Sequence, residues 1–225
     1  MQLHEQFRPY QWSEVVGQDK AIAILDRIRK RGLSGRTYFV TGAYGTGKTT
    51  IARLIAAEVA DPHATDEIDG SEVTAAVLDD LRHQRQSRPF GKGYCLIIDE
   101  CHILRDATVT KLLKLTEGLP PWVTVIFCTS AEGVEALHDK DDFGALLSRC
   151  TKLPLARRDL TKPFAIRLVA GAREAGLLNG HVDTYYVARA ERLCKEQRNN
   201  LRACWQAVEA GYLTASEADA SEVSV

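Results

Sequence analysis

The stretch that decides the fold is GAYGTGKT, Gly42 to Thr49. It matches the pattern G-x-x-x-x-G-K-[ST], follows the short apolar run YFVTG at 38–42, and leads into the helical pattern KTTIARLIAAEVA at 48–60. The glycines let backbone N–H groups turn toward phosphate oxygens, and the following helix adds the positive end of its dipole. Lys48 is placed to reach β and γ phosphates, and Thr49 to ligate Mg²⁺. A strand, this loop and a helix predict a nucleotide phosphate site rather than a turn without a ligand.

The second part of the expected site is the sequence CLIIDE at 95–100, an apolar strand that ends in two acids. An acidic residue at the carboxyl end of a parallel strand faces the same crevice as the loop. Asp99 is placed to hold Mg²⁺ directly or through water, and Glu100 to polarise the water that attacks the γ-phosphoryl group. The pair favours hydrolysis over a small-molecule kinase, which keeps its acceptor dry, and over a nucleotide-binding structural subunit; both alternatives stay open.

Strand and helix patterns alternate through the first two thirds of the chain. Apolar runs without alternation indicate a sheet that is covered on both faces, hence parallel and wound with helices. The sequence therefore predicts an α/β fold with strands at 38–42, 94–99 and 122–129 and with helices at 19–32, 48–60, 71–84 and 106–115.

Strand signals stop after the segment CTKLPLARR, which ends at Arg158. Three helical stretches follow, at 159–175, 181–196 and 201–210, and predict a small all-α domain. The last residues are small, acidic and without pattern, as in disordered tails. We therefore expect an α/β nucleotide-binding domain at 1–157, a helical lid at 158–212 and a disordered tail at 213–225.

Composition bounds the remaining possibilities. Of 225 residues, 45% are apolar and 26% are charged, as in soluble globular proteins, and the net charge of −1 marks no nucleic-acid or membrane partner. No apolar run approaches the roughly 18 residues of a membrane span, and the start lacks a secretory signal, so we expect a cytoplasmic location. The six cysteines form no CxxC pair, which favours reduced, buried thiols over disulfides or zinc.

Six segments, taken in order, resemble a known group. They are FRPYQWSEVVGQ, GAYGTGKTTIARLIA, IIDECHIL, LLKLTEGLPP, VIFCTS and LLSRC, and they resemble the ATPase core of AAA+ clamp-loader subunits, the bacterial DNA polymerase III gamma/tau subunit and the small subunits of replication factor C. The resemblance runs from about Phe7 to Gly211. It implies a P-loop AAA+ parallel sheet with a helical lid, ATP and Mg²⁺ as cofactors, other AAA+ subunits in a homo- or hetero-oligomer, and a sliding clamp and primed DNA as partners, with no membrane partner.

The resemblance also implies roles for matching positions. The adenine pocket would be lined by Arg8, Pro9, Val16, Gly17 and Gln18. The phosphates would be held by Gly42, Gly45, Thr46, Gly47, Lys48, Thr49 and Thr50. Catalysis would involve Lys48 and Glu100, with Thr129 as a first sensor that orients the lytic water and Arg202 of NNLRAC as a second sensor on the γ-phosphate. Arg149 of LLSRCTKL, just before a short strand signal, would be an arginine finger for a neighbouring subunit, rather than a solvated surface cation.

Departures from the family pattern bear on partners. The segment EVADPHATDEIDG has no cysteine where bacterial gamma/tau subunits carry a zinc module, so zinc is not expected. The segment 130–147 is longer than usual and acidic in its middle. The helix that tracks DNA in the family begins here with DGSEVTAAV and places Glu72 where a cation would help. Candidate phosphate contacts, for which a solvated face is the open alternative, are Ser71, Thr74, Arg82, Arg85, Arg88 and Lys92.

The sequence given ends after the lid, whereas clamp-loader subunits continue into a helical collar. Three alternatives follow from this difference. Partners supply the collar, or nucleotide and the subunit interface alone drive assembly, or the chain is a clamp-loader-like ATPase with another task. The expected function is Mg²⁺-dependent ATP hydrolysis by a clamp-loader-like subunit that loads a sliding clamp at primed DNA. The alternatives are another AAA+ nucleoprotein remodeller, such as a helicase loader or branch-migration motor, and a nucleotide-gated assembly module with incidental hydrolysis.

Overall fold

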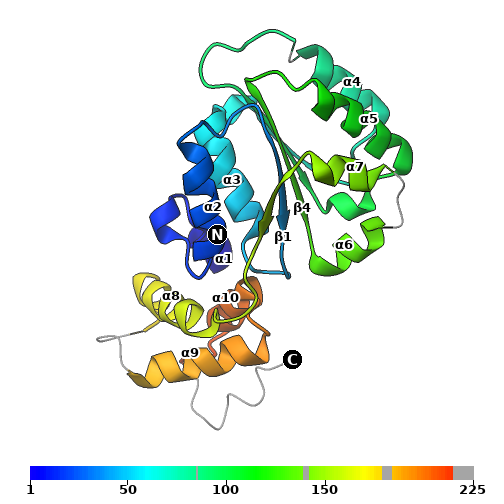
Figure 1. Ribbon diagram of the computed structural model, residues 1–225. Coiled ribbons are helices and arrows are strands. Elements are labelled where there is room, and N and C mark those ends of the chain that lie inside the picture. The colour runs from blue at the N-terminus through cyan, green and yellow to red at the C-terminus, as the bar shows by residue number, and fades with distance from the viewer. Residues whose placement is uncertain (85, 139–141, 179–183, 215–225) are drawn as a thin grey trace. The chain divides into compact units, whose positions relative to one another are not determined.

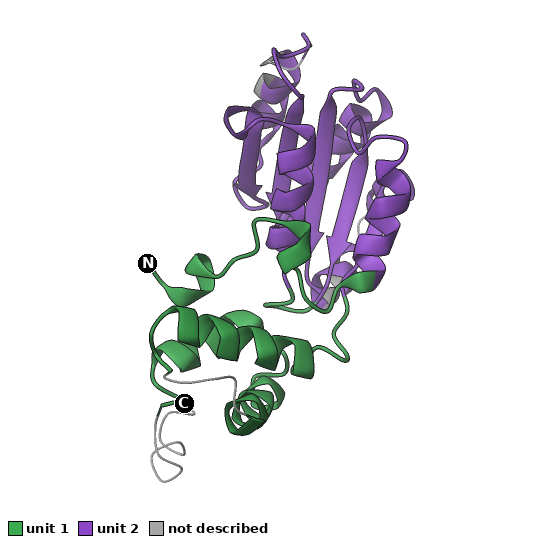
Figure 2. Cartoon of the chain, turned by 90° about the vertical axis from the view of Figure 1, so that its left-hand side faces the viewer, with its two compact units in different colours: residues 1–19, 43–46, 156–225 green, residues 20–42, 47–155 purple. Residues whose placement is uncertain are grey.

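The computed structural model describes residues 1–84, 86–138, 142–178 and 184–214. The chain divides into two compact units, which Figure 2 colours separately. Unit 2 comprises residues 20–42 and 47–155, and unit 1 comprises residues 1–19, 43–46 and the described residues from 156 onward.

Unit 2 is built on a five-stranded parallel sheet with the order β2-β3-β4-β1-β5. All seven residues of β4, the central strand, are buried, as its mostly apolar sequence predicts. The predicted parallel α/β architecture is therefore confirmed. The strands are β1 (Thr37–Thr41), β2 (Thr65–Asp69), β3 (Tyr94–Asp99), β4 (Val123–Thr129) and β5 (Thr151–Pro154).

Helices cover both faces of this sheet (Figure 1). On one face lie α2 (Asp19–Arg29) and α3 (Lys48–Val59), and on the other α4 (Ala75–Gln84), α5 (Asp106–Glu117) and α7 (Phe143–Ser148). An apolar core lies between the second face and its helices. In this core the rings of Phe39 and Phe143 pack edge to face, with their centroids 5.8 Å apart. Shorter elements of this unit are η2 (Pro62–Ala64), η3 (Cys101–Ile103) and α6 (Ala131–His138).

Unit 1 is helical and has its own core. It contains α1 (Leu3–Gln6), η1 (Trp12–Glu14), α8 (Thr161–Glu174), α9 (Thr184–Glu196) and α10 (Leu201–Glu209). The ring of Phe7 stacks on Trp205 of α10 with centroids 4.9 Å apart. Gly171 of α8 makes room for this pair, because a Cβ there would lie 2.4 Å from the Trp205 ring.

The compact units cross the domain boundaries expected from the sequence. Residues 1–19, expected in the α/β domain, group with the C-terminal helices because Leu3 and Phe7 are buried in their core. Leu213, expected in the tail, is buried in the same core. The rest of the expected tail, residues 215–225, lies outside the described residues.

Other elements differ from the expectation for local reasons. Strand β2 was not predicted because its sequence, TDEID, is polar; it lies at an edge of the sheet and is only partly buried. Helix α4 begins at Ala75 instead of residue 71. Helices α6 and α7 were not predicted, and the first residues of the expected helix at 181–196 lie outside the described residues. None of the helices in the described ranges is long and apolar enough to cross a lipid bilayer.

The burial of β4 predicts a large cost for Phe127→Ala. Phe127 is completely buried, so the substitution removes a large side chain and leaves a cavity, which costs roughly 3–5 kcal/mol. The matched control is Phe90→Ala, because Phe90 is fully exposed and its loss changes stability by less than about 0.5 kcal/mol. Urea unfolding followed by circular dichroism measures both, and equal midpoints for the two variants would contradict the assigned core.

Candidate nucleotide site

Parallel register brings the expected catalytic strand ends to one edge of the sheet. In β1 and β4, Thr41 is the partner of Thr129, and Gly42, the first residue of the glycine loop, donates its N–H to the Thr129 carbonyl oxygen at 3.3 Å. In β2 and β3, Asp69 is the partner of Asp99. The carboxyl ends of parallel strands are where α/β folds bind ligands. The start of the loop, the expected metal acid and the expected first sensor thus belong to the same edge of unit 2.

The two expected metal ligands are in direct contact. The Thr49 hydroxyl donates a hydrogen bond to Asp99 Oδ2 at 2.7 Å, and the other carboxylate oxygen of Asp99 accepts from the Glu100 N–H at 2.9 Å. A hydroxyl and a carboxylate are the hard oxygen donors that suit Mg²⁺, which is usually held by one or two protein groups plus phosphate oxygens and waters. The pair therefore fits a magnesium ion, with Thr49 and Asp99 as its ligands.

Glu100 has an unusual backbone. Its φ of 46° and ψ of 43° lie in the left-handed region, which costs a residue with a side chain about 1–3 kcal/mol. Its carbonyl lies close to the chain at Gly70, where a Cβ would come within 2.6 Å of the Glu100 oxygen. Buried Oε2 of Glu100 accepts no hydrogen bond from the part of the chain that the structure describes. The strained turn thus carries a buried carboxylate oxygen that has no hydrogen bond among the described residues.

Lys48 begins helix α3 directly after the glycine loop. Gly47 precedes it with a φ of 99°, a conformation that favours glycine, and Lys48 itself is 7% exposed. The side chain therefore leaves from the first turn of a helix, where the dipole favours anions. Thr50, the third residue of α3, is half-buried.

The remaining loop residues, 43–46, belong to unit 1 and are held there by Gln18. Thr46 bonds back to the carbonyl of Ala43 through its hydroxyl, at 2.7 Å. The buried amide of Gln18 donates to the carbonyls of Thr46 at 3.2 Å and Ala156 at 3.3 Å, and accepts from the Ala156 N–H at 2.7 Å. Gln18, expected in the adenine pocket, thus ties the loop to the segment that leads into α8.

Arg202 lies one residue beyond a second contact with the loop. The N–H of Leu201, at the start of α10, donates to the Gly45 carbonyl oxygen at 3.2 Å. Gly45 has a φ of +71°, and a Cβ there would collide with Asn200, the residue that caps α10. Arg202 itself is exposed. Unit 1 therefore places the expected second sensor on the helix whose N-terminus touches the glycine loop.

The other residues expected at the adenine lie in the first segment of unit 1. Arg8 forms an ion pair with Glu5, and Pro9 is half-buried. Val16 packs against the helical core, and Gly17, with a φ of +73°, lies where a Cβ would come within 2.5 Å of Leu160.

Arg149, the expected arginine finger, is bonded away from these groups. Within the described ranges its guanidinium donates to the Glu117 carboxylate at 2.7 Å and to the Ala145 carbonyl at 2.8 Å. Both members of the ion pair are exposed, with 38% of the Arg149 side chain and 52% of the Glu117 side chain accessible. Arg149 is thus a surface cation at the end of α7, with a partner in its own chain.

Sequence reasoning missed one residue beside the catalytic pair. His102, in the 3₁₀ turn after β3, has its Nδ1 at 3.0 Å from the Thr129 hydroxyl and at 3.3 Å from Glu100 Oε2. Its place in the segment IIDECHIL was visible, but nothing in the sequence joined it to Thr129, which lies 27 positions later.

Two cysteines near this edge, Cys101 and Cys128, are buried. Burial raises the pKa of Cys101 and Cys128 far above the ordinary thiol value, and it raises the pKa of Cys150 to about 12. All six cysteines are free, and five of them are buried. Buried structural thiols are inert rather than nucleophilic, and the burial expected for the cysteines is found for all but half-buried Cys150.

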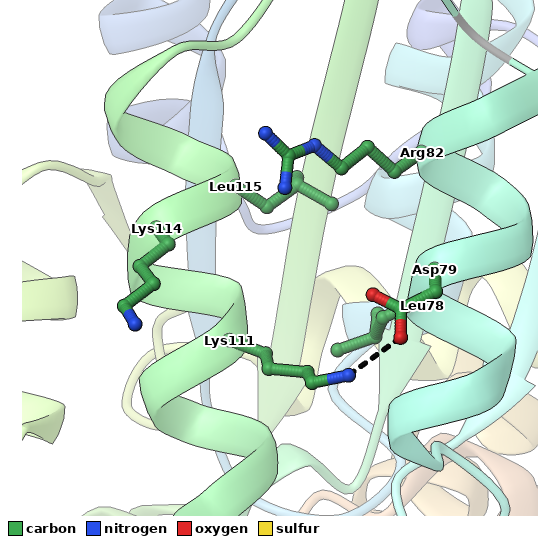
Figure 3. A pocket seen from close by; sticks show the side chains of 6 residues that line it. All are labelled: Leu78, Asp79, Arg82, Lys111, Lys114 and Leu115. Atoms are coloured by element: carbon green, nitrogen blue, oxygen red, sulfur yellow. Dashed lines mark hydrogen bonds and ion pairs between the residues drawn. The ribbon is translucent and has the colours of Figure 1, made fainter.

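A pocket lies between α4 and α5, and Arg82, one of the candidate phosphate contacts, is among its lining residues. Figure 3 shows its lining of Leu78, Asp79 and Arg82 from α4 with Lys111, Lys114 and Leu115 from α5. Lys111 donates to Asp79 at 2.6 Å, and this bond lowers the pKa of the Asp79 carboxyl.

The two hydroxyls expected to donate to DNA phosphates already have partners within the chain. The Ser71 hydroxyl and N–H both donate to Asp69, which lowers the pKa of that carboxyl, and the Thr74 hydroxyl oxygen accepts from the Val77 N–H at 3.3 Å. Arg85 lies outside the described residues. Lys111 of the α4–α5 pocket likewise has a partner, Asp79, whereas Arg82 and Lys114 add two further cations to this pocket.

Comparisons with known proteins agree on the family. The model of the ATPase family associated with various cellular activities (AAA) matches residues 38–151. DNA polymerase III subunit gamma/tau of Mycobacterium tuberculosis is 30% identical over 156 residues, which cover 58% of this chain and 27% of that protein. DNA polymerase III subunit gamma of Buchnera aphidicola is 24% identical over 227 residues, which cover 89% of this chain and 57% of that protein. The chain spans less than two thirds of the length of either relative.

A likeness to a solved structure supports the fold. A variant of Thermotoga maritima RuvB is similar with a TM-score of 0.66 and 24% sequence identity, over 90% of this chain and 64% of that chain. The family match extends over half of the sequence and contains the Lys48 loop, the Asp99–Glu100 pair, Thr129 and Arg149. The chain therefore belongs to the AAA family of ATPases.

Proposed function

We propose that the chain hydrolyses ATP with Mg²⁺. The observation that carries this proposal is the 2.7 Å contact between the Thr49 hydroxyl and Asp99, with Glu100 as the next residue. In this site Lys48 neutralises charge on the β and γ phosphates, Thr49 and Asp99 hold the metal, and Glu100 accepts the proton of the attacking water. The metal supplies charge neutralisation of the phosphates.

We propose that the α/β part, up to about residue 157, binds the nucleotide and that the C-terminal helices form a lid. Gln18, together with Arg8, Pro9, Val16 and Gly17, lines the adenine pocket in this proposal, and Arg202 reaches the γ-phosphate from α10. The supporting contact is the hydrogen bond from Leu201 to Gly45, which joins the start of α10 to the phosphate loop within unit 1.

Arg149 is proposed to act on a neighbouring subunit. Its ion pair with Glu117 is exposed, and exposed pairs contribute about 0–1 kcal/mol, so a phosphate can replace the carboxylate at little cost. A cation supplied by a neighbour stabilises the charge of the transferring phosphoryl group and is worth roughly 10³–10⁵ in rate. Hydrolysis then requires an oligomer of AAA+ subunits, with copies of this chain or related chains.

The proposed task is loading a sliding clamp onto primed DNA in the cytoplasm. Its support is that relatives named as DNA polymerase III gamma or gamma/tau subunits match this chain, and that segments of the sequence resemble clamp-loader subunits. The alternatives that remain are another AAA+ nucleoprotein remodeller, such as a helicase loader or branch-migration motor, and an assembly module with incidental hydrolysis.

Mixed variants test the shared site. Arg149→Ala and Glu100→Gln are expected to bind ATP with wild-type affinity and to lose at least about 10²-fold in steady-state hydrolysis, because each removes a group used at the transition state. Mixing Arg149→Ala with Lys48→Ala should restore part of the activity, since one interface then pairs an intact loop with an intact finger. The measurement is phosphate release against protein concentration.

The control mixture contains the single variant Arg149→Ala and the double variant that carries both Arg149→Ala and Lys48→Ala. No interface in this mixture has an intact finger, so it should stay inactive. Wild-type activity that is independent of protein concentration, together with no rescue in the mixture, would contradict the role of Arg149 in a neighbour's site. Adding a clamp and primed DNA separates the tasks: stimulation by both supports loading, whereas indifference to both supports the assembly module.

The α4–α5 pocket predicts a graded effect on DNA binding. If Arg82 and Lys114 each neutralise one phosphate, Arg82→Ala and Lys114→Ala lower the slope of log affinity against log salt by about 1 each. Fluorescence anisotropy of primed DNA at several salt concentrations measures the slope. Lys20→Ala, on exposed Lys20 of α2, is the matched control. An unchanged slope in both pocket variants would show that this face is only solvated.

A further inference from the structure

We propose that His102 is a positioning residue for hydrolysis: its Nδ1 holds the Thr129 hydroxyl and orders it against the Glu100 carboxylate. This inference rests on the proposed ATP hydrolysis, and it assigns a role to a side chain that touches neither the phosphate loop nor the metal pair among the described contacts. It makes the 3₁₀ turn after β3 part of the machinery that orients the attacking water.

The geometry places one nitrogen between two catalytic oxygens. Nδ1 of His102 lies 3.0 Å from the Thr129 hydroxyl, which is a hydrogen bond, and 3.3 Å from Glu100 Oε2, which is a charge contact without hydrogen-bond alignment. Thr129 ends β4 and is completely buried, whereas Glu100 and His102 sit in the turn that ends β3. One imidazole therefore joins the ends of two neighbouring strands.

Helix α6 keeps the imidazole in this place. Gly133 of α6 packs so closely that a Cβ there would lie 2.8 Å from the His102 ring and would collide with the Thr129 hydroxyl. Gly133 is held in turn, because its N–H donates to the Ser130 hydroxyl at 3.0 Å. His102 and Thr129 thus pack against Gly133 of α6, and there is no room for a side chain at that position.

The proton on Nδ1 determines what the two oxygens can do. Of the two neutral tautomers of His102, we take the one with the proton on Nδ1, because Nδ1 is the nitrogen that lies 3.0 Å from the Thr129 hydroxyl and 3.3 Å from Glu100 Oε2. In this proposal the Nδ1–H of His102 donates to the Thr129 hydroxyl oxygen, 3.0 Å away, so the proton of the hydroxyl is available to another acceptor. Oε2 of Glu100 meanwhile keeps free lone pairs in a buried setting. The hydroxyl becomes a donor and the carboxylate an acceptor, the two functions needed to orient a water molecule.

Two substitutions separate this role from simple packing. His102→Phe keeps an aromatic ring of similar shape but has no nitrogen, whereas His102→Asn loses the ring and can place an amide N–H near the position of Nδ1. A positioning role predicts that Asn retains activity and Phe does not. A packing role predicts the opposite order. His63→Ala is the matched control, because His63 is exposed in the 3₁₀ turn before β2.

The experiment measures kcat and KM for ATP, with nucleotide affinity determined separately by a fluorescent analogue. We expect His102→Phe to lower kcat by about 10- to 100-fold with KM and affinity unchanged, since misplacing a catalytic group by about 1 Å costs up to roughly 10²-fold. His102→Asn should stay within about fivefold of wild type. In a Thr129→Val background the effect of His102→Phe should largely vanish, because the two residues act as one unit.

The possible failures are distinguishable. A wild-type protein that hydrolyses no ATP at any concentration, with or without DNA and clamp, contradicts the proposed function itself and this inference with it. If the wild type is active, two results contradict the role of His102 and leave the ATPase proposal intact. One is a fully active His102→Phe. The other is a double variant in which the losses of kcat from His102→Phe and Thr129→Val multiply. Unfolding midpoints near the wild-type value for both His102 variants show that any lost activity is not lost folding.

Discussion

The site of unit 2 depends on the parallel pairing of the buried strand β4 with β1 on one side and β3 on the other. Parallel strands end at the same edge of a sheet, so Gly42 after β1, the acids at the end of β3 and Thr129 at the end of β4 belong to one edge of unit 2. The hydrogen bond from the Gly42 N–H to the Thr129 carbonyl oxygen holds the first residue of the loop at the end of β4. All seven residues of β4 are buried, so neither face of the strand is distinguished by exposure, and the backbone pairing with β1 and β3 specifies its register.

The acids at this edge have different environments, and the difference follows from the turn that holds them. Both oxygens of Asp99 already accept hydrogen bonds, from Thr49 and from the Glu100 N–H, which suits a group that binds a cation. Glu100 stands in a left-handed conformation with a buried oxygen that accepts none, which suits a group that must receive a proton during the reaction. A strained backbone beside an unsatisfied acceptor is common at functional sites, where the surrounding structure bears the cost.

Unit 1 holds residues 43–46 by a separate set of contacts. Gln18 satisfies three backbone groups with one buried amide, and Leu201 reaches the Gly45 carbonyl from the start of α10. The bonds of Gln18 with Ala156 and of Leu201 with Gly45 join segments more than a hundred residues apart in the sequence. They also explain why the first nineteen residues, which carry Phe7 and Gln18, pack with the C-terminal helices rather than with the sheet that follows them in the chain.

By itself the sequence determined the parallel α/β fold, the phosphate loop, the Asp99–Glu100 pair and the family, because each depends on local order: apolar runs of strand length, glycines at set spacing, and acids at a strand end. Only the tertiary structure decided what depends on distant residues. It showed β2 as a polar edge strand, which pairs only because β3 lies beside it, and it grouped Leu3 and Phe7 with the C-terminal core. It also showed the hydrogen bond of Arg149 with Glu117 and the contact of His102 with Thr129. Such contacts join elements that are separate in the sequence, and a pattern of neighbouring residues carries no information about where a distant hydroxyl or carboxylate will lie.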